Sequence, residues 1–241
     1  VMTIAIADAL INSGTDDNFI DSMKRLGRLY PDYGYGARFG SWLFSDDRRP
    51  YNSWGNGSAM RVSPCGWDVP LHQFMREGFE DVELLAERSA MVTHNHPEGI
   101  KGAKAIAMSI YFMRHGRAHG DIDTYKDYLK RDISEWYGYD LNRTLDEIRP
   151  AYHFNESCQE TVPEAIIAFL EGTGFEDAIR NAISLGGDSD TLAAITGGIA
   201  EAAYGIPRDI ADGALSYLDK PLREVYDRWC LFCDNYTQTT Q

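Results

Sequence analysis

Two aspartates and a threonine stand together where an apolar stretch begins. Asp188, Asp190 and Thr191 follow the pair Gly186-Gly187 and lead directly into the Ala- and Ile-rich segment 192–200. The pattern predicts a helix entered through a tight turn, with both carboxylates in its first turn, where the helix dipole favours negative charge. Two carboxylates this close repel each other, which raises one pKa unless a cation lies between them. Because carboxylate and hydroxyl oxygens are the ligands that Mg²⁺ or Mn²⁺ prefers, the segment predicts either a metal site or a doubly acidic helix cap.

A glycine-containing turn forms the second candidate site. The segment Asn56-Gly57-Ser58-Ala59-Met60-Arg61 combines turn residues with helix-forming residues, and Ser58 is the expected N-cap. The backbone N–H groups of such a turn can hold an anion such as a phosphate, because they face outward at the positive end of a helix. A helix-capping turn without a ligand is the alternative that this segment alone leaves open.

Two histidines lie at a junction between two expected helices, in Thr93-His94-Asn95-His96-Pro97-Glu98. A zinc site would need a further Cys or His at suitable spacing, and none is evident in the sequence. His94 lies near the end of an apolar helix and is therefore the better functional candidate. His96 is expected at the surface of the junction.

Helix-terminating residues divide the rest of the chain into apolar-periodic segments, and no period-two run of β-branched residues appears. Small residues in segments 102–107 and 193–203 predict close helix–helix packing that supports the acidic helix start. We therefore expect an all-α fold, a compact single-domain bundle of roughly ten or more helices over residues 1–241. The expected helices are 2–12, 18–29, a short one after the aromatic loop that starts at Tyr33, 80–93, 97–114 ending at Gly116, 121 or 123 to 136, 144–148, 163–171, 175–185, 190–204, 207–218 and 221–235.

Composition limits the classes of function. The chain has 241 residues and a formal net charge of −14, which argues against a nucleic-acid or anionic-membrane surface as its main partner. No apolar run approaches the roughly 20 residues that span a bilayer, so no membrane segment is expected. Four cysteines are too few for a disulfide framework, and Cys230 and Cys233 are interpreted as thiols at helical spacing rather than as a zinc or redox pair. These features indicate a cytoplasmic protein, and the lack of a heptad seam indicates a monomer.

Taken together and in this order, the three motifs resemble the ADP-ribosylglycohydrolase family, the relatives of the dinitrogenase reductase-activating glycohydrolase. The similar segments are Trp54-Gly55-Asn56-Gly57-Ser58-Ala59-Met60-Arg61, Thr93-His94-Asn95-His96-Pro97-Glu98 and Gly186-Gly187-Asp188-Ser189-Asp190-Thr191. The combination of D-x-D-T with N-G-x-x-M-R at this separation is fairly specific, and the resemblance runs from Val1 to about Gly205.

The resemblance implies a metal-dependent hydrolase that removes ADP-ribose from a modified protein side chain or a related ADP-ribose conjugate. It implies a cleft with two Mg²⁺ ions, or Mn²⁺, whose ligands include Asp188, Asp190 and Thr191. Metal ions would orient the ribose and lower the pKa of a water, and a carboxylate would act as general base. Asp46 or Asp47 is a candidate for that base, with an exposed turn as the alternative. The expected catalytic residues are Asp188, Asp190 and Asp47, and the expected substrate-binding residues are Asn56, Gly57, Ser58, Met60, Gly187 and His94, the last beside the ribose.

One part of the family's pattern is absent. The family's other metal-binding motif, Thr-Asp-Asp-Thr, normally precedes a helix like the segment 1–10, and this sequence starts where that motif would end. The expectation is a fragment of a longer protein, and the alternative is a pocket that binds metal poorly. A catalytically inactive ADP-ribose-binding or structural, crystallin-like protein on the same scaffold is therefore the second functional hypothesis. Tyr33, Tyr35 and Phe39 are candidates for the adenine site, with core positions as the alternative.

Overall fold

The computed structural model describes residues 1–71 and 76–238, and these form fourteen helices without a β-strand. The all-α prediction is thus confirmed. Within these ranges the only strand-like pairing is an isolated antiparallel bridge between Gly55 and Ser157. The helices are α1 (Met2–Ile11), α2 (Asp16–Leu29), α3 (Ala37–Phe44), α4 (Gly57–Arg61), α5 (Ser63–Asp68), α6 (Arg76–Met91), α7 (Pro97–His119), α8 (Ile122–Tyr137), α9 (Leu145–Ile148), α10 (Cys158–Glu171), α11 (Phe175–Ser184), α12 (Ser189–Tyr204), α13 (Arg208–Leu215) and α14 (Lys220–Gln238).

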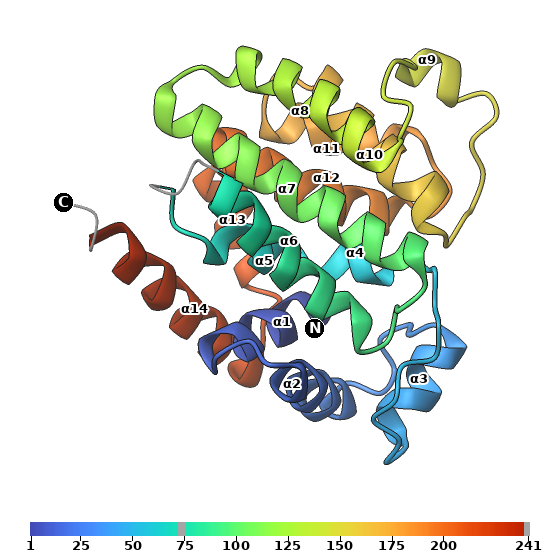
Figure 1. Cartoon of the computed structure of the whole chain (residues 1–241), viewed down its shortest axis with the longest axis vertical. Coiled ribbons are helices and arrows are strands. Elements are labelled where there is room, and N and C mark those ends of the chain that lie inside the picture. Colours follow the sequence, from blue (N-terminus) through green and yellow to red (C-terminus); the bar gives the residue numbers. More distant parts are fainter. Residues whose placement is uncertain (72–75, 239–241) are drawn as a thin grey trace.

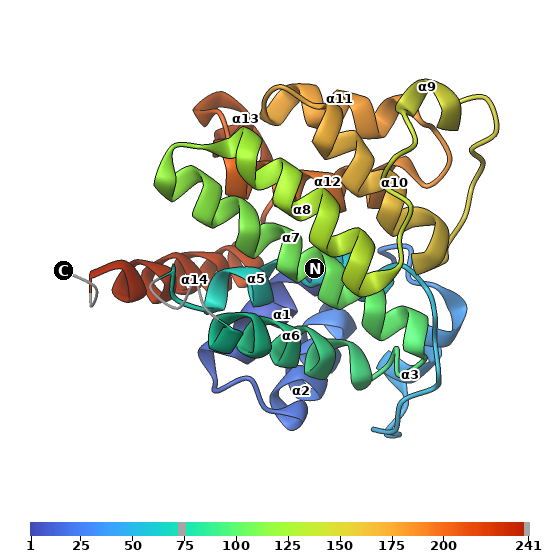
Figure 2. The ribbon, with the colours of Figure 1, turned by 45° about the horizontal axis from the view of Figure 1, so that its top comes forward.

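Helix α7 runs through the middle of the molecule and packs against α6, α8, α10 and α12 (Figure 1). Figure 2 shows that α7 separates two groups of helices: α8 to α13 lie on one side, and α1 to α3, α6 and α14 lie on the other. The short helix α4 contacts both α7 and α12. The two predicted motifs on α4 and α12 are therefore neighbours in the fold.

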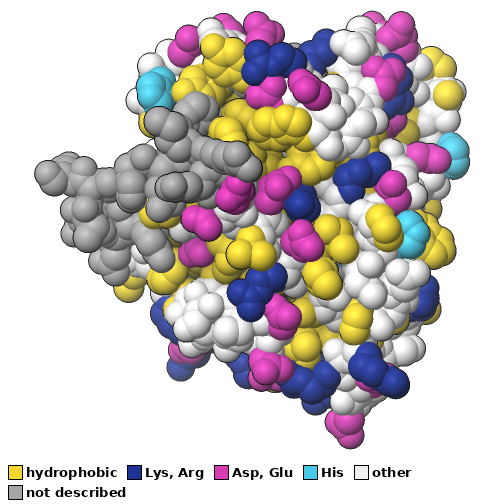
Figure 3. Space-filling model, viewed as in Figure 1, with side chains coloured by type: hydrophobic (Ala, Val, Ile, Leu, Met, Phe, Trp, Pro, Cys, Tyr) yellow, Lys and Arg dark blue, Asp and Glu magenta, His cyan; other side chains and the backbone are white. Residues whose placement is uncertain are grey.

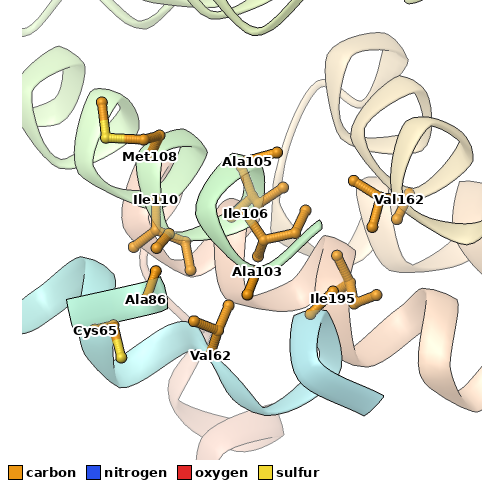
Figure 4. Close-up of a cluster of buried hydrophobic side chains, with 14 of the residues drawn as sticks. Val62, Cys65, Ala86, Ala103, Ala105, Ile106, Met108, Ile110, Val162 and Ile195 are labelled. Carbon is orange, nitrogen blue, oxygen red and sulfur yellow. The ribbon is translucent and has the colours of Figure 1, made fainter. Parts of the chain in front are cut away.

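Small residues allow the helices to approach α7 closely. A Cβ added at Gly102 would lie 2.6 Å from Cys158 Sγ of α10, and a Cβ at Gly66 of α5 would lie 2.7 Å from the Ala107 carbonyl oxygen. Figure 4 shows the apolar cluster that results, in which Ile106 and Ile110 of α7 lie among side chains from α6, α10 and α12. This packing gives the acidic start of α12 a rigid support.

Several helix boundaries differ from the sequence prediction, and contacts explain three of the differences. Helix α7 continues through Gly116 and ends at His119, and its C-cap residue Gly120 has the left-handed φ of 69°. Gly116 is needed for packing instead, because a Cβ there would lie 2.8 Å from Tyr125 Cβ of α8. Helix α10 begins at Cys158, before the expected residue 163, because the Cys158 N–H donates to the Trp54 carbonyl oxygen 3.0 Å away.

The third difference lies at α4, where Ser58 is not the N-cap. Helix α4 begins at Gly57, and the Ser58 hydroxyl lies within it, buried, and donates to the Gly99 carbonyl oxygen at 2.8 Å. The short helix α5 was not expected from the sequence.

On the face shown in Figure 3, basic and acidic side chains are interspersed among the described residues. None of the described helices is both long and apolar enough to cross a bilayer. Cys230 and Cys233 are free thiols that both lie on α14, at the helical spacing expected from the sequence, and burial raises the pKa of both.

Candidate functional site

The turn before α4 meets the acidic start of α12. Asn56 Nδ2 donates a hydrogen bond of 2.7 Å to Asp188 Oδ2, although the two residues are 132 positions apart. Both side chains are almost completely removed from solvent, with 8% and 9% exposure. The structure therefore brings together two of the three predicted motifs in one buried polar contact.

The backbone around Asn56 is held by the segment that leads into α10. The Asn56 N–H donates to the Glu156 carbonyl oxygen at 2.7 Å, and Gly55 pairs with Ser157 in the isolated bridge. The thiol of Cys158 also donates to the Gly55 carbonyl oxygen at 3.1 Å. These contacts fix the turn before any ligand is bound.

The Asn56 side chain uses its amide hydrogens on protein partners. Besides Asp188, Nδ2 contacts Thr161 Oγ1 at 3.1 Å and the Asn155 carbonyl oxygen at 3.4 Å. An amide nitrogen carries two hydrogens, and Asn56 directs them to these protein partners. Asn56 therefore orients the Asp188 carboxylate, a role that is separate from its predicted contact with the substrate. Sequence reasoning missed Thr161 and Asn155, and no local signal marks them, since they reach Asn56 only through the packing of α10.

Two glycines in the left-handed region precede the acidic cluster. Gly186 and Gly187 have φ values of 73° and 62°. A Cβ added at Gly187 would lie 2.9 Å from both the His153 carbonyl oxygen and Tyr152 Cε1. The glycine at 187 therefore permits the segment before α10 to pass directly over the start of α12.

Asp188, Asp190 and Thr191 occupy the first turn of α12, as predicted. Asp188 is the N-cap residue, Asp190 is exposed in the first turn, and the buried Thr191 hydroxyl donates to Met60 Sδ at 3.6 Å. Burial raises the pKa of Asp188, and the neighbouring Asp190 carboxyl raises it further, while hydrogen bonds from Asn56 and Thr191 act in the opposite direction. The two carboxyl groups are thus close enough to affect each other's ionisation.

The oxygen atoms of Asp188, Asp190 and Thr191 are suitable ligands for one hard divalent cation, which they would contact from the α12 side. Two carboxylates and a hydroxyl are suitable ligands for Mg²⁺, which commonly keeps several waters. Across the described residues, however, no group of three or more His, Cys, Asp or Glu side chains is placed to hold a metal ion. The predicted pair of ions therefore remains a prediction, and a single ion at Asp188, Asp190 and Thr191 is what this donor set fits.

His94 lies beside the same turn. A Cβ added at Gly57 would lie 3.4 Å from His94 Nε2, and one at Gly55 would lie 3.6 Å from it. The imidazole is 5% exposed, and burial lowers its pKa well below the ordinary value, with a further contribution from the positive charges of Arg61 and Arg38. His94 is therefore neutral and faces the turn from the α6–α7 junction.

Asp47 lies apart from this cluster. It is in an exposed turn after α3, where its carboxylate accepts hydrogen bonds from the Arg49 guanidinium at 2.8 and 3.0 Å. These bonds hold the pKa of Asp47 well below its usual range. No described contact joins Asp47 to Asn56, His94 or Asp188. Its predicted role as a catalytic carboxylate therefore gains no support from the geometry.

The three aromatic residues that were predicted to bind adenine differ in burial: one is exposed, and two pack against the core. Tyr33 is exposed, whereas Phe39 packs against Trp42 with 5.8 Å between ring centroids. Tyr35 contacts Phe39 in an edge-to-face arrangement at 5.6 Å. The ring centroid of Phe39 also lies 5.8 Å from the buried Arg61 guanidinium. This part of the aromatic cluster therefore packs against α4.

Comparison with known proteins gives a consistent assignment. The family model for ADP-ribosylglycohydrolase matches residues 1–237. The chain is 26% identical to the human ADP-ribosylhydrolase ARH3 over 293 residues, covering 99% of this chain and 74% of that protein. It is 31% identical over 189 residues to an uncharacterized protein of Archaeoglobus fulgidus, covering 71% of this chain and 57% of that protein.

Two further similarities point in the same direction. The chain is 26% identical over 180 residues to the ADP-ribosyl-[dinitrogen reductase] glycohydrolase of Rhodospirillum rubrum, covering 71% of this chain and 53% of that protein. A solved structure described as an ADP-ribosylglycohydrolase-related protein complex superposes with a TM-score of 0.66 at 24% identity, over 98% of this chain and 79% of that one, and shows the same fold. Because the family model matches almost the whole chain, this protein belongs to the ADP-ribosylglycohydrolase family, a family of hydrolases.

Proposed function

We propose that this protein hydrolyses the glycosidic bond between ADP-ribose and a modified protein side chain or a related conjugate. The observation that carries the proposal is the Asn56–Asp188 hydrogen bond of 2.7 Å. It joins a glycine turn suited to an anion and an acidic helix start suited to a cation. A diphosphate-bearing sugar with a divalent ion is a ligand that needs both.

The local charge supports binding of an anionic substrate to a protein whose formal net charge is −14. Arg61 and Arg38 both lie close enough to His94 for their positive charges to lower its pKa, so two cationic side chains lie on the His94 side of the Gly55–Gly57 turn. The opposite side carries Asp188 and Asp190. A diphosphate would be attracted to the first side, and a cation to the second.

The proposed cation is Mg²⁺ or Mn²⁺, with Asp188, Asp190 and Thr191 as its ligands from this chain. When bound, such an ion would stabilise developing negative charge and lower the pKa of a coordinated water. Asn56 keeps the Asp188 carboxylate in one orientation through its 2.7 Å hydrogen bond. Glycosidic cleavage passes through an oxocarbenium-like state, so placing an oxygen nucleophile beside the anomeric carbon is the task of this side of the site.

The direct test measures ADP-ribose release from peptides modified on arginine and on serine, with and without Mg²⁺ or Mn²⁺. Asp188→Asn and Asp190→Asn are expected to reduce metal-dependent release by at least about 100-fold, an effect typical of losing a catalytic electrostatic group. Asp209→Asn is a matched control, because Asp209 is an exposed acid in the first turn of α13. Wild-type turnover by both site variants would overturn the proposal.

The same experiment addresses the remaining alternatives. Asp47→Asn tests the predicted catalytic role of Asp47, which requires a loss of turnover. Tight binding of ADP-ribose without turnover by the wild-type chain would favour a non-catalytic binding protein. Cation binding is measured separately as stabilisation against unfolding, expected to reach about 2.7 kcal/mol when the ion is present at 100 times its Kd.

A further inference from the structure

A fully buried arginine lies behind His94. Arg61 of α4 is 2% exposed, and its Nη2 donates to the Ser89 carbonyl oxygen at 3.0 Å and to Thr93 Oγ1 at 2.8 Å. Thr93 is itself fully buried in the turn that follows α6. A buried guanidinium is costly unless it is bonded, and here its partners within the described residues are one carbonyl oxygen and one threonine hydroxyl, with no carboxylate among them, so its placement calls for an explanation beyond packing.

The Thr93 hydroxyl connects Arg61 to His94. Thr93 Oγ1 lies 2.8 Å from His94 Nδ1. Because a guanidinium only donates hydrogen bonds, the threonine oxygen accepts from Arg61 and keeps its own hydrogen for another partner. Among the described residues, His94 Nδ1 is the only acceptor within reach of that hydrogen.

The direction of these bonds selects one tautomer of His94. If Nδ1 carried the hydrogen, the buried threonine hydroxyl would have no acceptor, which is the unfavourable arrangement. With Nδ1 accepting, the hydrogen of the neutral imidazole lies on Nε2. Nε2 is the atom that faces the turn, 3.4 Å from the position of a Cβ on Gly57, and the described residues give it no hydrogen-bond acceptor.

The charged and titratable groups that face His94 favour the same state. They are Arg61 from α4, Arg38 at the start of α3, and the phenol of Tyr51, whose ring centroid lies 6.0 Å away. The two cations oppose protonation of the ring. No described carboxylate contacts the imidazole to counter them.

We propose that Arg61 and Thr93 are positioning residues, which hold His94 as the Nε2–H tautomer so that it donates a hydrogen bond to a ligand oxygen beside Gly57. The ligand oxygen belongs to a hydroxyl or a phosphate of ADP-ribose, and this identification rests on the proposed function. The tautomer itself follows from protein contacts alone and is measurable without any ligand.

The tautomer is tested by ¹⁵N NMR of the imidazole nitrogens in the ligand-free chain at neutral pH. The chain has six histidines, and comparison with the spectrum of His94→Gln identifies the signals of His94. The expected spectrum shows an unprotonated Nδ1 and a protonated Nε2. A protonated Nδ1, or an imidazolium, would overturn the proposal.

The role of Thr93 is tested by Thr93→Val, which removes the hydroxyl at nearly constant volume. We expect a mixture of tautomers in the spectrum and an ADP-ribose affinity about fivefold lower, the size of effect expected for one hydrogen bond. Thr93→Ser is expected to restore both the tautomer and the affinity. Thr196→Val is the matched control, because Thr196 is equally buried and its hydroxyl donates to the Ala165 carbonyl oxygen away from His94.

The outcomes separate the inference from the proposed function. A Thr93→Val protein with a shifted tautomer but unchanged affinity would overturn the role in ligand binding. A wild-type chain that shows the Nε2–H tautomer but does not bind ADP-ribose would contradict the proposed function and the ligand assignment, while the Arg61–Thr93–His94 assignment would be upheld. Equal loss of affinity in Thr93→Val and Thr196→Val would reduce Thr93 to a structural residue.

Discussion

At the scale of single residues, Asn56 illustrates why a motif has more than one role. Its side-chain nitrogen bonds to Asp188, Thr161 and the Asn155 carbonyl oxygen, and its backbone N–H bonds to Glu156. The residue therefore connects the turn before α4 with α10 and α12. Removal of its side chain would leave a buried carboxylate without its donor.

Asn56→Ala is expected to lower the free energy of unfolding by about 1–3 kcal/mol, the cost of leaving a buried polar group unpaired. The measurement is urea denaturation at neutral pH without added metal. Asn181→Ala is the control, since Asn181 Nδ2 makes one long bond of 3.4 Å to the Ala168 carbonyl oxygen. Equal losses in the two variants would show that the Asn56–Asp188 bond makes no special contribution.

The glycines before α12 permit a sharper comparison. Gly186 and Gly187 both have positive φ, but a Cβ at Gly186 meets no atom within 4 Å, whereas one at Gly187 meets His153 and Tyr152 at 2.9 Å. Gly186→Ala thus adds only backbone strain, about 1–2 kcal/mol for an L-residue in the left-handed region. Gly187→Ala is expected to cost at least about 1 kcal/mol more, because overpacking is added to that strain. Thermal or urea unfolding of both variants measures the difference, and equal costs would contradict the contact with segment 152–153.

The sequence predicted part of the site at this scale. The placement of Asp188, Asp190 and Thr191 in one helical turn follows from their spacing, because residues this close in a helix start share its N-terminal end. Thr161 could not be predicted, since it reaches Asn56 across 105 positions through the packing of α10. The buried orientation of Ser58 was missed for the same reason, as its partner Gly99 belongs to α7.

At the scale of helices, α1 is tied to its two neighbours through one buried acid. Asp8 of α1 is 3% exposed and accepts from Ser22 at 2.6 Å and Arg25 at 2.5 Å, both on α2. Arg228 of α14 approaches its other oxygen at 3.4 Å. The carboxylate therefore joins two consecutive helices, α1 and α2, to α14, which lies at the other end of the sequence.

Asp8→Asn is expected to destabilise the protein by about 1–3 kcal/mol, because the amide cannot accept from all of these donors. The loss stays below that of a fully buried pair, since the side chains of Arg25 and Arg228 are half exposed and can turn to water. Arg228→Gln is expected to cost less than about 1 kcal/mol, as its contact is long and solvated. Urea denaturation gives both values. A larger loss for Arg228→Gln than for Asp8→Asn would contradict the expectation that Asp8 is held mainly by its contacts with α2 and only weakly by α14.

The existence of most helices was predictable from periodicity and caps, whereas the short helix α5 and some helix ends were not. Thr15 caps α2 and Asp121 caps α8 through their own side chains, so local sequence was sufficient there. Gly116 looks like a helix end but lies inside α7, because its missing Cβ accommodates Tyr125. The start of α10 depends on pairing with Trp54 and Gly55, which no local pattern encodes.

At the scale of the whole molecule, two buried titratable groups change the free energy of unfolding in opposite directions as the pH rises. Burial raises the pKa of Asp68 to about 6, and one of its oxygens is buried with no hydrogen-bond partner among the described residues. Burial lowers the pKa of His115 to about 4. His115 resists protonation in the folded state, so its effect is to reduce stability as pH falls below the unfolded value of about 6.5.

Asp68 acts in the opposite direction. Its folded pKa lies above the unfolded value of 3.8, so its stabilising contribution is complete below pH 3.8 and is lost as pH rises through about 6. Above that pH the wild-type protein bears the cost of a buried charge, which Asp68→Asn removes. The variant should exceed wild type by about 1–3 kcal/mol in unfolding free energy at pH 8, and the difference should shrink towards pH 4.

The His115 contribution is common to both proteins and cancels in this difference, which makes the Asp68 comparison a clean one. Urea denaturation of wild type and Asp68→Asn across this pH range gives the dependence directly. Asp123→Asn is the control, because Asp123 is an exposed acid in the first turn of α8 and its replacement should change the unfolding free energy only slightly. A difference between Asp68→Asn and wild type that stays constant with pH would show that Asp68 is ionised at the same pH in the folded and unfolded chains. The Arg114 charge would then compensate for burial in full, since it is the group that opposes the rise in the pKa of Asp68.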